Sequence, residues 1–138
     1  MRLLAIFSLL ILGLGNGTKN IKTQTSDLNG TWVPTKQEFA GKQWPASMYE
    51  KQTLVIKDNT YVVTAESVDK GEVKYGEGNK MDIYGKEGPN AGKHFTAIYK
   101  CENGLLTICY NLAGDTYPEG FETKSKTMLF LSVFKKAE

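Results

Sequence analysis

Apolar and polar residues alternate along much of the chain, as is typical of β-strands that bury one face. The clearest case lies on either side of Asn103-Gly104, a dipeptide that favours a two-residue type I′ turn. This turn pairs Cys101 with Leu106, and a shift by one residue would mix apolar with polar positions. One sheet face is then expected to carry Phe95, Ala97, Tyr99, Cys101, Leu106, Ile108 and Tyr110.

A second hairpin is predicted around Asp58-Asn59, which pairs Ile56 with Tyr61 and Leu54 with Val63. Further strand-like runs cover 30–39, 71–76, 80–85 and 127–136, separated by segments rich in glycine or proline. Only residues 45–51 suit a helical turn or two. About eight strands joined by short connections predict an all-β fold, an antiparallel up-and-down barrel, because closure removes exposed strand edges.

The predicted register separates the two cysteines. Cys101 and Cys109 fall on opposite faces of the hairpin and about 10 Å apart along it, at about 3.3 Å per residue. A disulfide requires Cα atoms within about 7 Å. We therefore expect two free thiols, with Cys101 in the core and Cys109 half-exposed.

The N-terminus has the layout of a secretory signal peptide. Arg2 precedes an apolar run, and small residues follow at Gly15 and Gly17. The run is shorter than the roughly 20 residues of a membrane-spanning helix, so no stable membrane insertion is expected. We predict a signal peptide at 1–17, a flexible segment at 18–28 and a barrel domain at 29–138, with export to the bacterial periplasm or the medium. The alternatives are an uncleaved anchor or a buried N-terminal strand.

Net charge, arginine content and length limit the classes of partner that the chain is expected to bind. The formal net charge of +2 is too small to indicate nucleic acid or a membrane surface. Arg2 is the only arginine, so the mature chain lacks the guanidinium group that usually grips phosphate or carboxylate. The 138 residues fit a single domain, which we expect to be monomeric.

No pattern of reactive residues indicates an enzyme. His94 is the only histidine, and neither HExxH nor CxxC spacing occurs. The acidic residues are scattered singly, which gives no anchor for a pair of catalytic carboxylates. His94 is interpreted as a surface residue at a strand end, and no metal or cofactor is expected.

Aromatic residues are better candidates for a binding site than the reactive residues are. Tyr61, Phe95, Tyr99 and Tyr110 fall on predicted core faces. They either pack a solid core or line a pocket, because tyrosine offers an apolar body with a polar hydroxyl. Trp44, beside Pro45, is placed near a barrel mouth or on a surface that binds a protein partner.

The sequence Gly30-Thr31-Trp32 resembles the Gly-x-Trp motif that opens the barrel of lipocalins. In that family the tryptophan packs across the closed end of the barrel, against a basic residue of the last strand. The resemblance implies that Trp32 closes the barrel, with Lys135 or Lys136 as its partner. An arginine is usual at that place in lipocalins.

Most of the mature chain also resembles an uncharacterised, lipocalin-like bacterial domain family that was described first from planctomycetes. The Ile-Tyr and Leu-Thr-x-Cys-Tyr centre of that family is matched by Ile98, Tyr99, Leu106, Thr107, Cys109 and Tyr110. Its Arg-Pro-x-x-Phe motif is matched at Pro118 and Phe121, whereas Tyr117 replaces the arginine. The resemblance implies the barrel fold and leaves the activity open.

Two functions follow as hypotheses. The first is a non-catalytic barrel that binds a small, largely apolar ligand through Tyr61, Phe95, Tyr99, Tyr110 and Trp44. The second is a protein-interaction or inhibitor module with a packed core, which would use Trp44, Tyr117 and the loop Gly85–Gly92. Whether the interior is hollow separates them, and a lining tyrosine reads the same in sequence as a packed one.

Overall fold

The structure of the protein, a computed structural model, describes residues 28–138. The predicted signal peptide and residues 18–27 lie outside the described residues. The described chain consists of nine strands and one short 3-10 helix. These are β1 (Gly30–Phe39), β2 (Lys42–Gln43), η1 (Ala46–Met48), β3 (Thr53–Lys57), β4 (Thr60–Thr64), β5 (Val68–Tyr75), β6 (Lys80–Glu87), β7 (His94–Glu102), β8 (Leu105–Asn111) and β9 (Leu129–Lys136).

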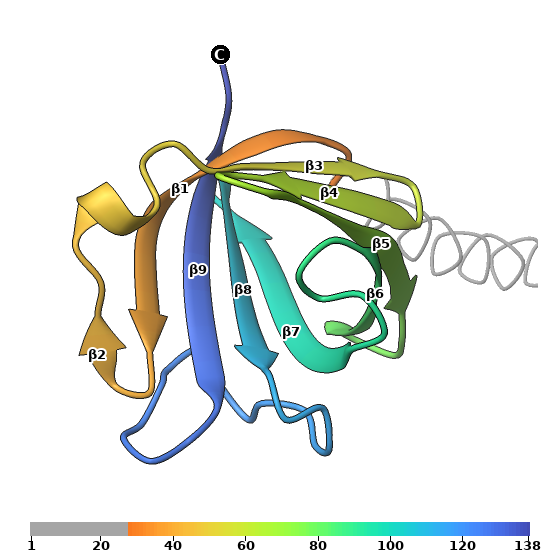
Figure 1. The fold of residues 1–138 in the computed structure, drawn as a ribbon. Helices are drawn as coiled ribbons and strands as arrows, with labels where there is room; N and C mark the ends of the chain where they lie inside the picture. Colours follow the sequence, from red (N-terminus) through yellow and green to blue (C-terminus); the bar gives the residue numbers. More distant parts are fainter. Residues whose placement is uncertain (1–27) are drawn as a thin grey trace, which may run out of the picture.

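The strands form one antiparallel sheet that closes on itself as a barrel (Figure 1). β1 and then β3 to β9 follow one another around the barrel, and β9 pairs back with β1. Only β2 stands outside this ring, pairing with the end of β1. The predicted all-β up-and-down barrel is therefore confirmed, with β2 as a strand where a loop was expected.

The two predicted hairpins have the predicted registers. Cys101 pairs with Leu106 across the β7–β8 turn, in which Asn103 and Gly104 both have positive φ, as a type I′ turn requires. In the β3–β4 hairpin, Ile56 pairs with Tyr61.

The two cysteines are free, as predicted, but their burial is the reverse of the prediction. Cys101 is exposed, because its place beside the hairpin turn puts it at the end of the barrel. Cys109 is fully buried, because the loop between β8 and β9 covers the outer face on which it lies. Tyr117 and Phe121 of this loop pack against a small outer cluster of Ile98, Cys109 and Leu131.

On one edge β1 pairs with β3 only over Gly30–Trp32, and on its other edge it pairs with β9 from Trp32 to Phe39. The segment that contains β2 and η1 lies along the part of β1 that β3 leaves unpaired. The backbone N–H of Trp44 donates to the Gln37 carbonyl at 2.9 Å, and the Tyr49 hydroxyl donates to the Thr35 carbonyl at 3.1 Å. This segment therefore completes the barrel wall between β1 and β3.

Side chains fill one end of the barrel. Trp32 is 1% exposed, and its Nε1 donates to the carbonyl of Leu28, which is equally buried. The Nζ of Lys136 lies over the Trp32 ring and donates to the Asn29 carbonyl at 2.7 Å. Trp32 thus lies at the position expected from its motif, and Lys136 rather than Lys135 is its partner. Leu28 belongs to the packed core rather than to the flexible segment predicted at 18–28.

The opposite end is open. The registers place the turns after β3, β5 and β7 at the closed end and the connections after β1, β4, β6 and β8 at the open end. Figure 1 shows the β6–β7 loop curling across the interior of the ring. Within residues 28–138, no helix is long and apolar enough to cross a membrane.

Candidate functional site: a cavity in the barrel

A cavity of about 490 Å³ lies inside the barrel. All eight barrel strands contribute side chains to its wall, because alternate residues of each strand face inward. The aliphatic part of the wall consists of Leu54, Ile56, Val63, Val73, Met81, Ile83, Ile108 and Leu112. The interior of this barrel is therefore hollow and mainly apolar.

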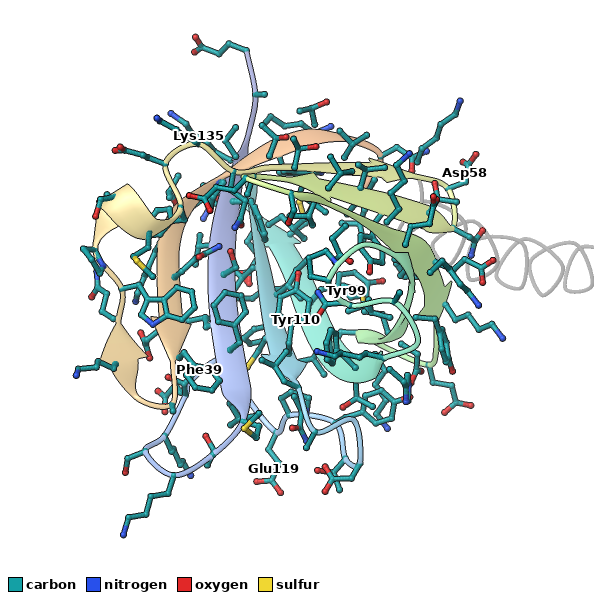
Figure 2. The ribbon with its side chains drawn as sticks, in the orientation of Figure 1. Phe39, Asp58, Tyr99, Tyr110, Glu119 and Lys135 are labelled. Atoms are coloured by element: carbon teal, nitrogen blue, oxygen red, sulfur yellow. The ribbon has the colours of Figure 1, made fainter. Side chains whose placement is uncertain are left out.

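Aromatic rings from β1, β8, β9 and the segment after β2 lie together in the cavity wall. Trp44 lies 6.3 Å from Phe39 and 5.3 Å from Phe130, measured between ring centroids. Phe130 in turn lies 5.8 Å from Tyr110, which Figure 2 shows within the ring of strands. These distances are typical of aromatic pairs in protein interiors, so the four rings form a continuous row along this side of the wall.

A first polar group lies in the wall near β1. Gln37, 1% exposed, donates through Nε2 to Gln52 Oε1 at 2.8 Å and to Ser132 Oγ at 3.2 Å. Within residues 28–138 the Gln37 Oε1 atom has no hydrogen-bond partner. All three side chains line the cavity. A buried acceptor without a donor is costly, so this oxygen is unusual in the wall.

A second polar group connects the wall to the β6–β7 loop. Asp69 accepts hydrogen bonds from the Tyr61 hydroxyl at 3.3 Å and from the backbone and side chain of Asn90 at 3.3 and 3.0 Å. All three residues line the cavity. Asn90 belongs to the loop that crosses the interior in Figure 1, so Asp69 holds this loop against the barrel.

Gly85 lets the loop lie close to β6. A Cβ atom at Gly85 would lie 1.9 Å from the Asn90 carbonyl oxygen, far inside van der Waals contact. Gly85 also donates its N–H to the Lys93 carbonyl and accepts from the Gly92 N–H, each at 2.9 Å. Only glycine permits this approach.

The cavity has little positive character. Its described lining contains no lysine, arginine or histidine, and Asp69 is its only acidic residue. Burial raises the pKa of Tyr61, and the neighbouring Asp69 carboxylate raises it further. Burial likewise raises the pKa of Tyr110. Both phenols are thus neutral hydroxyl groups at any physiological pH.

Four of the five residues predicted to line a pocket do line this cavity: Tyr61, Phe95, Tyr110 and Trp44. Tyr99 does not. It lies nearer the closed end, where its ring packs edge-on against Tyr75 at 5.8 Å, and it borders a smaller hollow beside Cys101. The register put Tyr99 on the inner face correctly, but its distance along the strand places it below the cavity floor.

Sequence reasoning missed the polar residues of the wall. Gln37, Gln52 and Ser132 are isolated polar positions in strand-like runs, and nothing in their spacing marks them as neighbours. Strict alternation from the core residue Trp32 would place Gln37 on the opposite face, and only the irregularity between Pro34 and Lys36 turns Gln37 inward.

Another polar cluster lies outside the barrel. Asp82 accepts from the Tyr117 hydroxyl at 2.6 Å and lies 2.7 Å from His94 Nε2, whose ring stacks on Tyr84. Although partial burial opposes it, hydrogen bonds from Tyr117 and His94 lower the pKa of Asp82. His94 is partly exposed at the start of β7, in agreement with its prediction as a strand-end residue. The cluster fastens the β8–β9 loop to β6.

The described residues hold no group of three or more side chains suited to bind a metal ion. Comparison of the chain with protein-family models, curated proteins and solved structures finds no match. The site is therefore interpreted from its geometry alone.

Proposed function

We propose that this protein is an exported, non-catalytic, lipocalin-like binder that holds a small, largely apolar ligand inside its barrel. The observation that carries the proposal is the hollow interior of about 490 Å³. Small-molecule sites typically have volumes of about 300–1,000 Å³ and are mostly apolar with a few placed polar groups. The wall described above has this composition.

The alternative, a protein-interaction or inhibitor module, receives less support. It requires a packed core, whereas the barrel encloses a cavity. Its contact residues are also engaged within the fold: Trp44 lines the cavity, Tyr117 binds Asp82, and the Gly85–Gly92 loop is held by Asp69.

Binding of a neutral apolar fluorophore, N-phenyl-naphthylamine, tests the proposal. The wild-type protein should bind it with enhanced fluorescence. Val63→Trp should abolish or strongly weaken binding, because Val63 lines the cavity and indole would fill part of it.

Val62→Trp is the matched control. Val62 precedes Val63 on β4, so its side chain points to the outer face of the barrel. This variant should bind the fluorophore as the wild type does. Equal binding by both variants, or none by the wild type, would contradict the proposal.

Native mass spectrometry of protein recovered from its source cells tests the same proposal without a probe. We expect a small-molecule adduct of one-to-one stoichiometry and a mature chain that begins after Gly17 or Gly15. A co-purifying protein in place of the adduct would favour the interaction module, and an intact N-terminus would contradict export with cleavage.

A further inference from the structure

The side chains that line the cavity indicate which chemical class of ligand it would bind. This inference rests on the function proposed above. Three features of the wall bear on it: the charge of the lining, the state of the Asp69 carboxylate and the unpaired oxygen of Gln37.

The lining disfavours an anionic ligand. The cavity residues include no cationic side chain, and the acid among them, Asp69, is itself negative. Moving an unpaired carboxylate from water into such a site is expensive, because neither a counter-ion nor water compensates for the lost solvation.

Asp69 does not offer a free site for a ligand donor. Its Oδ2 already accepts from Tyr61 and Asn90, and its Oδ1 accepts from the Asn90 backbone. A carboxylate that receives three hydrogen bonds within the protein gains little from a further donor. Its role is to hold the loop.

Gln37 is different. Its amide nitrogen has two acceptors, Gln52 and Ser132, which fix the amide in place, while Oε1 has no partner within residues 28–138. Gln37 is in the wall of the cavity, and an unpaired buried acceptor gains a hydrogen bond at little cost when a donor reaches it.

We propose that the barrel selects a neutral, largely apolar ligand that bears a hydroxyl group, and that this hydroxyl binds the side-chain amide of Gln37. Polar recognition then occurs at Gln37, since the Asp69 carboxylate already accepts hydrogen bonds from Tyr61 and Asn90. Specificity arises because an analogue without the donor leaves the buried oxygen unpaired.

Three probes with the same phenylbutyl body test this assignment by calorimetric titration: phenylbutanol, its methyl ether and phenylbutyrate. The alcohol should bind the wild type up to about tenfold more tightly than the ether, the value of one hydrogen bond. Phenylbutyrate should bind most weakly.

Gln37→Met keeps the side-chain length and removes the amide. It should bring the alcohol and the ether to equal affinity. Gln43→Met makes the same change at an exposed position of β2 outside the lining, and it should preserve the wild-type order.

A measurement on the wild type covers the case in which Gln37→Met does not fold. The side-chain amide NMR signals of Gln37 should shift on addition of phenylbutanol and remain in place with the ether. Equal affinities of the three probes for the wild type, tighter binding of ether or carboxylate, or unmoved Gln37 signals would overturn the assignment alone. Failure of every probe and of the neutral fluorophore to bind would overturn the proposed function as well.

Discussion

The ammonium group of Lys136 lies over the indole ring of Trp32, 4.8 Å from the ring centroid. The two residues are cross-strand partners of β1 and β9, the strands whose pairing closes the barrel. The same Nζ donates to the Asn29 carbonyl. The Lys136 side chain therefore connects β9 both to the indole ring of Trp32 and to the backbone that precedes β1.

Lys136→Met should therefore lower the free energy of unfolding by about 1 kcal/mol, through loss of the cation–π contact and the hydrogen bond. Urea denaturation measures this change. Lys135→Met is the matched control, because this exposed neighbour faces away from Trp32, and it should change stability by less than about 0.5 kcal/mol. Equal effects of the two substitutions would contradict the role of Lys136.

The thiols should differ in reactivity. Native protein should react with a disulfide reagent at Cys101 only, since Cys109 is fully buried and burial raises its pKa to about 11. Denaturation should release the second thiol without a reductant. Peptide mapping identifies the modified cysteine, and modification of Cys109 in the folded protein would show that the β8–β9 loop does not cover it.

The contact between Tyr117 and Asp82 should be visible in the pH dependence of stability. Folding lowers the pKa of Asp82, so this carboxylate stabilises the folded state. Its contribution to the free energy of unfolding is complete above the unfolded pKa of about 4. It is lost as the pH falls through the lower folded value. Tyr117→Phe removes one of the hydrogen bonds that lower the pKa, and should cost about 1 kcal/mol at neutral pH.

The loss of stability on acidification should consequently be smaller in Tyr117→Phe than in the wild type. Denaturation midpoints measured from pH about 6 down to about 2 test this expectation. Tyr84→Phe is the control, because its ring can still stack on His94, and it should follow the wild-type curve. If Tyr117→Phe lost as much stability on acidification as the wild type, Tyr117 would not be responsible for the lowered pKa of Asp82.

Gly85→Ala should displace the β6–β7 loop, because the added methyl group would overlap the Asn90 carbonyl. We expect a loss of about 1–3 kcal/mol in stability, as for other overpacked sites. Amide hydrogen exchange in residues 88–93 should also become faster. At Gly120 an added methyl group meets nothing within 4 Å, so Gly120→Ala should behave as the wild type in both measurements.

Local signals in the sequence were sufficient for the architecture. Asn103-Gly104 determines a turn geometry and therefore a register, and alternation then assigns each residue of β7 and β8 to a face. Burial could not be read in the same way. Cys109 is covered by a loop that is distant in sequence, and Cys101 is exposed because the barrel ends there, so both depend on how the chain returns over the sheet.

The candidate site was only partly accessible from sequence for a related reason. Strand alternation identifies Tyr61, Phe95 and Tyr110 as inward-facing, but a hollow depends on the summed volume of all inward side chains and on the tilt of the strands. The contact of Gln37 with Ser132 joins the first and last strands, and it exists only once the barrel closes.

Leu28 and Trp32 pack one end of the barrel, and the cavity opens at the opposite end, beside the connections after β1, β4, β6 and β8. If the proposed ligand occupies the cavity, it and its replacement would enter and leave at this same open end. Exchange of a ligand bound as proposed should then require its dissociation first, at a rate that stays constant as the concentration of competitor is raised.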